Sequence, residues 1–323
     1  MLHVANGHHT TRLIERSGAS GRTMVWCDPL YDGPVPDVPD EELLRIRARF
    51  LAASDSAAGA VLADLAGWRK AVDDHAQYDE LVLWFEHDLF DQLNLIQLLA
   101  HIDRQGGASK PLSLICINAY PGHSNFKGLG ELEPADIAAL FPTRRPVIAA
   151  QFDLATRAWA AFRSADPRTI ETLINGDTSA LPYLAPALAR HLEEFPSAID
   201  GLSRSERRLM QLASQAPADL QRAFPAMHEG ERAFYITEST FLSRARSLSE
   251  STPPLLTLHV TPGRAHTLPA GTIALTDAGR DVLNGRADRL ALCGIDRWIG
   301  GVRVTGHGPA WRWSDKAGTI VLL

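Results

Sequence analysis

Polar residues follow each of four short apolar runs near the start of the chain, and their types suit proton transfer or ligand binding. Asn6 and Gly7 follow the first run, Asp28 follows the second, and Glu86 opens the polar segment after the third. Ligands of an open parallel sheet bind beyond the carboxyl ends of its strands, where carboxylates and imidazoles serve as acids and bases. We therefore predict a small-molecule pocket there. Its candidate catalytic residues are Asp28, Glu86 and His87, and its candidate ligand-binding residues are Asn6, Gly7, Thr10, Asp88, Asp91 and Gln92.

Several of these residues also have a purely structural interpretation. Gly7 and Thr10 fit a tight turn from a strand into a capped helix. A helix N-terminus that binds a phosphate or carboxylate is the functional alternative. Asp88 fits the N-cap of the following helix, and Asp91 is favourably placed against the dipole of that helix. Neither explanation accounts for Glu86.

The pattern identifies no cofactor. The loop after Asn6 contains neither a Walker lysine nor a GxGxxG motif, so nucleotide binding is the lesser interpretation. His8, His9 and His87 are competent metal ligands, but no HExxH-type spacing joins them, and we predict no metal site. A solvated helix face explains three nearby arginines more simply than an anion clamp does. They are Arg45, Arg47 and Arg49.

The elements that must position these residues are short buried strands separated by helices. Apolar runs at 2–5, 23–27, 81–85 and 112–117 have the length and composition of strands. Continuous rather than alternating apolar strands indicate a parallel sheet covered on both faces. We predict an α/β domain over residues 1–150, with a Rossmann-like or flavodoxin-like sheet whose strand order is open. Residues 151–200 have helical spacing and are predicted as a helical connector.

Residues 201–323 are predicted to form a winged-helix-like domain with a C-terminal β extension. A capping box at Ser203–Glu206 opens its first helix, and further helices are predicted at 217–224 and 239–249. Strands at 255–260 and 271–275 flank a loop that contains proline and glycine, and a last helix follows Thr276. One face of the third helix could enter the major groove of DNA. Its residues are Thr240, Ser243, Arg244 and Ser247.

Composition and charge exclude several classes of protein. Hydrophobic residues make up 45% of the 323, which suffices for real cores, but no apolar run approaches the ~18–20 residues of a membrane span. The first residues lack the pattern of a signal peptide. The three cysteines are isolated, so we expect neither disulfides nor a thiolate zinc site, and we expect a cytoplasmic location.

The net charge of −6 is distributed unevenly. From Gly201 onward fifteen basic and eleven acidic residues give +4, whereas the preceding part has seventeen and twenty-seven and a net charge of −10. An acidic N-terminal part and a mildly basic C-terminal part of the chain fit two domains with different partners. A surplus of four positive charges is weak support for nucleic-acid binding.

Four strings in the first 140 residues resemble a bacterial family. They are the runs at 3–7 (HVANG), 26–35 (WCDPLYDGPV), 83–95 (LWFEHDLFDQLNL) and 128–132 (GLGEL). The family is the one named domain of unknown function 1835. The strings at 177–182 (DTSALP) and 294–298 (GIDRW) are similar to its longer members. The family has an acidic residue where His8 stands, so the resemblance assigns no role to His8; it implies the α/β domain and its pocket, without an activity.

Our leading interpretation is a pocket in the α/β domain for a small anionic metabolite or nucleotide, with Glu86, His87 and Asp28 as acid–base groups if the site is catalytic. The alternative is a ligand-responsive transcription regulator, in which the same pocket senses the molecule and residues 201–285 bind double-stranded DNA. A purely structural adaptor is the third hypothesis. Retardation of duplex DNA with a steep salt dependence would separate the first two. The sequence leaves the oligomeric state open.

Overall fold

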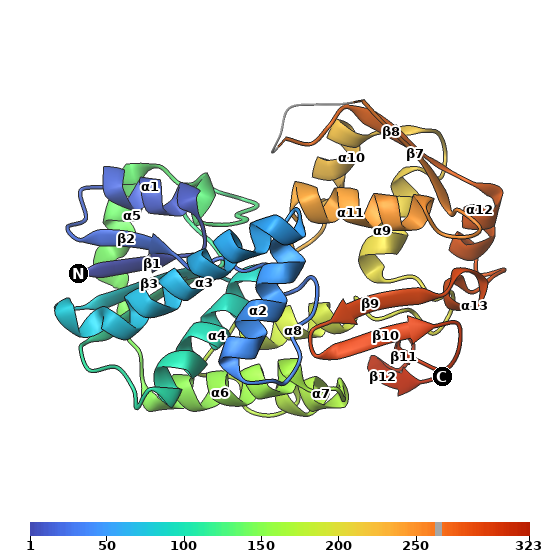
Figure 1. Ribbon diagram of the computed structural model, residues 1–323. Coiled ribbons are helices and arrows are strands. Elements are labelled where there is room, and N and C mark those ends of the chain that lie inside the picture. Colours follow the sequence, from blue (N-terminus) through green and yellow to red (C-terminus); the bar gives the residue numbers. More distant parts are fainter. Residues whose placement is uncertain (262–266) are drawn as a thin grey trace. The chain divides into compact units, whose positions relative to one another are not determined.

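The computed structural model describes residues 1–261 and 267–323 of the chain (Figure 1). They divide into two compact units, one of residues 1–188 with 300–302 and the other of residues 189–299 with 303–323. The middle of the predicted proline- and glycine-containing loop, residues 262–266, lies outside the described residues.

The first unit is built on a five-stranded sheet with the order β2-β1-β3-β4-β5. Its strands are β1 (Leu2–Ala5), β2 (Arg22–Val25), β3 (Leu81–Glu86), β4 (Leu112–Ile117) and β5 (Arg145–Pro146). The first four in chain order run parallel to one another, which confirms the prediction of an α/β unit on a mostly parallel sheet. The two-residue β5 is antiparallel to β4 and was not predicted, because so short a strand has no hydrophobic periodicity to detect.

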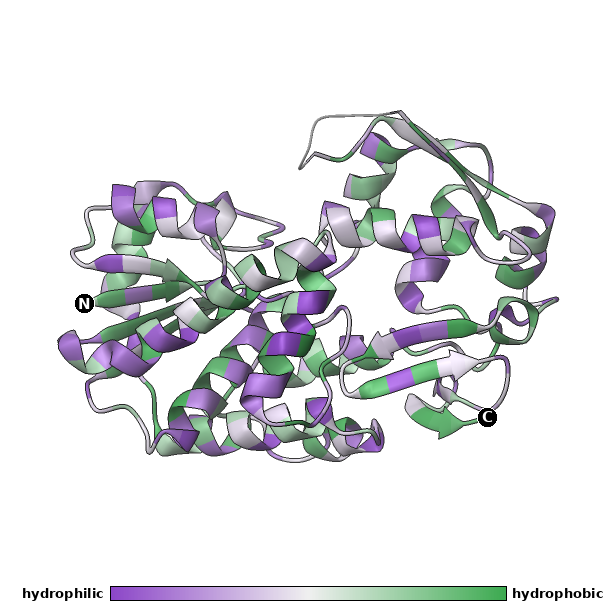
Figure 2. Cartoon of the chain, in the orientation of Figure 1, coloured by the Kyte–Doolittle hydropathy of each residue, from purple (hydrophilic) through white to green (hydrophobic). Residues whose placement is uncertain are grey.

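Helices cover both faces of this sheet. Helices α1 (His8–Arg16) and α5 (Pro134–Leu140) share one hydrophobic core with Val82 and Trp84, which point to the same face of β3. Helix α4 (Leu89–Arg104) packs against β3 and carries a long run of buried residues. Helices α2 (Asp40–Leu51) and α3 (Ala58–Asp73) pack on each other, and α2 is tied to α4 by the Arg104–Asp40 ion pair. Figure 2 shows hydrophobic colouring along β1 and β3 and a mixture of hydrophilic and hydrophobic colouring on the helices around them.

The predicted helical connector consists of α6 (Ala149–Arg163), α7 (Arg168–Ile174) and α8 (Leu184–Leu192). Helix α6 packs along α4, and the Thr156 hydroxyl donates to Asp103 at 2.9 Å. Helix α7 begins directly after Pro167. Short 3-10 turns complete the unit at Asp55–Ala57, Asp74–Gln77, Leu129–Glu131 and Phe141–Thr143.

The second unit combines short helices with small antiparallel sheets. Its helices are α9 (Arg204–Leu212), α10 (Leu220–Met227), α11 (Glu238–Ser249), α12 (Asp277–Leu283) and α13 (Arg289–Cys293). Strands β6 (Ala218–Asp219), β7 (Leu256–Val260) and β8 (Gly271–Leu275) form a sheet in the order β6-β8-β7. Two hairpins follow, β9 (Ile295–Ile299) with β10 (Val302–Gly306) and β11 (Trp311–Ser314) with β12 (Thr319–Leu322).

The helix predicted at 217–224 begins later than its pattern indicates. Residues 218–219 form the edge strand β6, and the Asp219 side chain accepts the backbone N–H groups of Gln221 and Arg222. That cap fixes the start of α10 at Leu220. In the part of the chain that the structure describes, no helix combines the length and hydrophobicity needed to cross a membrane.

Candidate active site at the carboxyl edge of the first sheet

The carboxyl ends of β1 and β3 lie side by side, at the point where the chain changes direction across the sheet. The connection after β1 leads to β2 on one side, whereas β3 lies on the other side of β1. Open α/β sheets bind ligands at such a switch point. Asn6 and Gly7 follow β1 directly, and Glu86 is the last residue of β3.

Asp91 links these two strand ends. One of its carboxylate oxygens accepts the Asn6 side-chain amide at 2.8 Å, and the other accepts the backbone N–H of Glu86 at 2.8 Å. The Thr10 hydroxyl in turn donates to the Asn6 amide oxygen at 3.1 Å. Asp91 is buried, so its role goes beyond the favourable helix-dipole position that its place in the sequence indicates.

The first turn of α4 completes the network. The Asp88 side chain is the N-cap and accepts the backbone N–H of Asp91 at 2.9 Å, as the capping interpretation predicts. The Gln92 amide donates to the Glu86 carbonyl at 2.6 Å and lies 3.4 Å from the Cys116 sulfur at the end of β4. The structure thus joins Asn6, Thr10, Glu86, Asp88, Asp91 and Gln92 in one buried or half-buried cluster.

The Glu86 carboxyl group is enclosed by the segment that follows β4. Its Oε1 accepts the backbone N–H of Leu129 at 2.5 Å, and only 6% of the residue is exposed. A Cβ atom added to Gly128 would stand 2.0 Å from its Oε2, so a side chain at position 128 would displace the carboxyl group. Gly128 and Leu129 were not among the predicted site residues, although they belong to the GLGEL string that carries the family resemblance.

Burial and mutual repulsion make the two inner acids hold their protons. Burial, followed by the charge of Asp88, raises the pKa of Glu86 to about 8, although hydrogen bonds from Leu129 and Asn6 act against the shift. Burial and then Glu86 raise the pKa of Asp91 well above its usual range. Because the two groups are adjacent, they titrate as a pair. Near neutral pH this pair therefore holds protons that an exposed carboxyl group has lost, and it can give one up.

The two nearby thiols are not activated for nucleophilic chemistry. Burial, with Asp28 and Asp91, raises the pKa of Cys27 to about 12. Burial and Asp91 also raise the pKa of the Cys116 thiol. A thiol with a raised pKa stays protonated and is a weak nucleophile. The chemistry that this cluster supports is therefore proton exchange and hydrogen bonding by carboxyl and amide groups.

His87 lies at the rim of the cluster. Its ring meets the Tyr183 ring edge to face, with centroids 6.3 Å apart, and is half-buried. The Tyr183 hydroxyl donates to the side chain of Asn118, which follows β4, at 3.2 Å. Burial raises the pKa of Tyr183. Tyr183 was not predicted as a site residue, and the only sequence signal is that it follows the DTSALP string directly.

Asp28 is engaged elsewhere, in a buried ion pair with Arg47 of α2. The Arg47 Nε lies 3.2 and 3.0 Å from the two carboxylate oxygens of Asp28, and a terminal nitrogen lies 2.5 Å from one of them. The side chain of Asn94 bonds both the N–H and the carbonyl of Asp28. Arg47 is 1% exposed, so the interpretation of this residue as part of a solvated face was wrong. It pairs inward because Asp28 and three carbonyl oxygens satisfy its donors.

The residues predicted to contact DNA do not form one exposed face of α11. Thr240 is buried, and Ser243 and Ser247 are exposed. Arg244 is half-buried, and its charge lowers the pKa values of the buried Glu194 and Glu206. The arginine surplus of this unit is also largely paired with acids. Ion pairs involve at least Arg204, Arg207, Arg208, Arg280, Arg286, Arg289, Arg297, Arg303 and Arg312.

Within residues 1–261 and 267–323, no group of three or more histidines, cysteines and acidic residues is arranged to hold a metal ion. Comparison of the chain with models of protein families and with curated proteins finds no match.

Proposed function

We propose that the carboxyl edge of the first unit binds a small polar molecule between the ends of β1 and β3, and that Glu86 and Asp91 exchange a proton with it. The observation that carries the proposal is the pair of buried carboxyl groups with raised pKa values at the switch point of the sheet. Asn6 and Gly7 supply the amide and backbone groups that orient the molecule, and the half-buried His87 lies at the entrance.

The charges favour a neutral or cationic molecule over the anionic one that the sequence suggests. The side chains that bond to Glu86 or Asp91 include amides, a carboxyl and a thiol. An anion about 4 Å from one ionised carboxylate would be repelled by ~4 kcal/mol at an effective dielectric constant of about 20. A hydroxyl or ammonium group would instead donate a hydrogen bond to the pair. An anion remains compatible only while both carboxyls are protonated.

We further propose that the first sheet is flavodoxin-like, since a strand order that begins 2-1-3-4 is the one that places a ligand at the switch between β1 and β3. Membership of residues 1–140 in the family named domain of unknown function 1835 stays a proposal that rests on the four strings of the sequence.

The order α9, β6, α10, α11, β7, β8, α12 supports a winged-helix arrangement in the second unit. DNA binding through it is the alternative function. That alternative rests on the order of elements alone, because Thr240 is buried and Arg244 interacts with buried acids. The site in the first unit is therefore the function that we propose.

The test is a thermal-shift and calorimetric screen of the full chain against nucleosides, amino acids, polyols and polyamines, with nucleotides as the anionic arm. Wild type is compared with Glu86→Gln. The matched control is Glu80→Gln, because Glu80 lies just before the first residue of β3, at the end away from the site, and is paired with Arg144. We expect a neutral or cationic compound to bind wild type and Glu80→Gln, with affinity that changes around pH 8, and to bind Glu86→Gln at least about tenfold more weakly. Tighter binding of nucleotides, unaffected by Glu86→Gln, would refute the proposal.

A further inference from the structure

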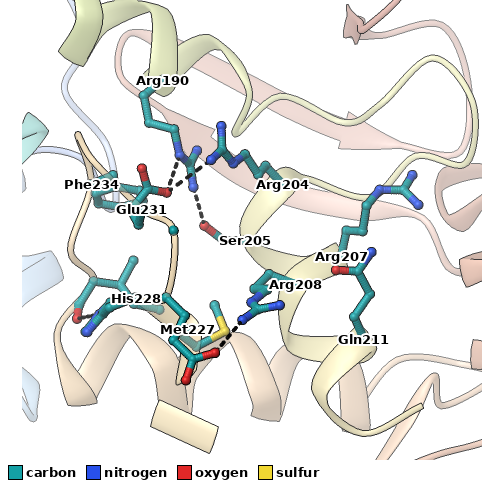
Figure 3. A pocket seen from close by; sticks show the side chains of 13 residues that line it. Arg190, Arg204, Ser205, Arg207, Arg208, Gln211, Met227, His228, Glu231 and Phe234 are labelled. Carbon is teal, nitrogen blue, oxygen red and sulfur yellow. Dashed lines mark hydrogen bonds and ion pairs between the residues drawn. The ribbon is translucent and has the colours of Figure 1, made fainter. Parts of the chain in front are cut away.

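The second unit contains a separate cavity of about 150 Å³ between α9 and the segment after α10 (Figure 3). Arg204, Arg208 and Gln211 lie on one face of α9, since they are four and then three residues apart, and Arg207 is adjacent. Arg190 of α8 points toward Glu231 and Ser205 (Figure 3). None of these residues was singled out by its pattern in the sequence.

The guanidinium group of Arg190 lies at the wall of this cavity and is held in place by two carboxylates. Its guanidinium nitrogens lie 2.8 Å from Glu231 and 2.8 Å from Glu194, and one donates to the Ser205 hydroxyl at 3.2 Å. The guanidinium carbon stands 5.1 Å from the centre of the Phe234 ring. With its side chain 6% exposed and held by two carboxylates, Arg190 remains charged, and its pKa is raised.

The arginines of α9 retain donors that the protein does not use. Arg204 donates one hydrogen bond, at 2.6 Å, to Glu193, and another of its nitrogens lies 3.7 Å from a Glu231 oxygen. Arg208 uses one terminal nitrogen for the Ala226 carbonyl at 2.8 Å and for Glu229 at 3.4 Å. Its Nε is buried and has no hydrogen-bond partner among the described residues.

Hydrogen-bond donors and size together define the ligand. Four arginines and two glutamates line the cavity. Each arginine is ion-paired with at least one acid, so their remaining N–H donors, and not a net charge, offer the contact. Its volume lies below the ~300–1,000 Å³ of pockets that enclose drug-sized molecules, so a whole nucleotide is too large. Guanidinium groups match the oxygens of phosphate and carboxylate. Met227, Phe234 and Ile236 provide an apolar wall for a few carbon atoms.

We propose that this cavity binds a small oxyanion, the phosphate or carboxylate group of a metabolite, through Arg204 and Arg208 above the fixed charge of Arg190. The anion accepts terminal N–H groups of Arg204 and Arg208 that make no hydrogen bond among the described residues. The first turn of α9 adds the positive end of its dipole. This site is independent of the proton-exchanging cluster in the first unit, so either proposal can fail without the other.

The experiment is calorimetric titration of the full chain with inorganic phosphate and, separately, with succinate, at constant ionic strength maintained with sodium chloride. We expect saturable binding of at least one of the two, and the tighter one identifies the phosphate or carboxylate group as the source. Arg208→Gln should weaken it at least about tenfold through the lost charge-assisted hydrogen bond. The matched control is Arg222→Gln, which removes the same charge from an exposed arginine outside the cavity lining.

A second variant keeps the test valid if Arg208→Gln does not fold. Gln211→Glu retains every arginine and adds one negative charge at an exposed position of the lining, and Gln215→Glu makes the same change at an exposed position outside it. We expect Gln211→Glu to weaken binding at least about tenfold and Gln215→Glu to leave it within about twofold. Equal weakening in both, or no saturable binding of either anion to wild type, would overturn the proposal.

Discussion

Replacement of Glu86 by glutamine should stabilise the protein at alkaline pH and leave its stability nearly unchanged in mild acid. Glutamine has the shape of a protonated glutamic acid, and its oxygen can keep the hydrogen bond from Leu129. Its amide group has no proton to lose near neutral pH. The wild-type side chain must either hold its proton or place a charge in a buried cluster beside Asp91.

The sign of the effect follows from the raised pKa. The carboxyl titrates at its ordinary value of 4.5 when the chain is unfolded and at about 8 when it is folded. Between these values the folded state binds the extra proton, so stability is highest below pH 4.5 and falls as the pH rises toward 8. Each pH unit costs about 1.4 kcal/mol. The loss of folding stability approaches ~3.5 kcal/mol at pH 7 and ~5 kcal/mol at pH 9. These are upper values, because Glu86 and Asp91 titrate as a pair.

The free energy of unfolding of Glu86→Gln should therefore exceed that of wild type by up to ~3.5 kcal/mol at pH 7 and equal it near pH 4.5. The assay is urea denaturation of both proteins at half-unit intervals from pH 4.5 to 9. Glu80→Gln is the control, since the pKa of Glu80 is lowered by Arg144 and its replacement cannot flatten this part of the curve. Parallel stability curves for wild type and Glu86→Gln over this range would refute the reasoning.

Three further substitutions test the contacts around both units. Asp28→Asn should cost ~3–5 kcal/mol in urea denaturation because it leaves Arg47 buried without its carboxylate; a loss under ~1 kcal/mol would return Asp28 to the list of catalytic candidates. Gly128→Ala should lower the melting temperature through the contact with the Glu86 carboxyl, and the double variant with Glu86→Ala should recover much of the loss; additive losses would contradict this contact. Burial acts to raise the pKa of Glu206, but Arg289 and Arg297 overcome it and hold the pKa at about 2. Wild type should thus lose stability as pH falls from 4.5 toward 2, whereas Glu206→Gln should lack that loss and be destabilised at pH 7 by ~3–5 kcal/mol.

The sequence by itself indicates most of the strands and helices and the edge of the sheet at which the candidate site lies. Continuous apolar runs indicate β1, β3 and β4, because a strand buried on both faces is mostly apolar wherever it lies in the sheet. Local hydrogen bonds can be predicted from the sequence equally well. Asp88 is an example, because its side chain caps the helix by accepting the backbone N–H of the residue three positions later. The rule that ligands bind beyond parallel strands then brings Asn6, Glu86 and Asp91 to one place.

Only the tertiary structure decides which charged and polar side chains meet. Arg47 and Asp28 are 19 residues apart, and Glu86 meets Leu129 across 43 residues, so no spacing rule for helices or strands connects them. Arg244 shows the same limit, since an arginine on the polar side of a helix can face solvent or a buried acid. Hydrophobic periodicity in the sequence indicates which face of a helix or strand is apolar, and it carries no information on the partner of a charged side chain. The partner of a buried charge is set by the packing of whole elements, because a charge leaves water only where an opposite charge or hydrogen-bonding groups are already in place.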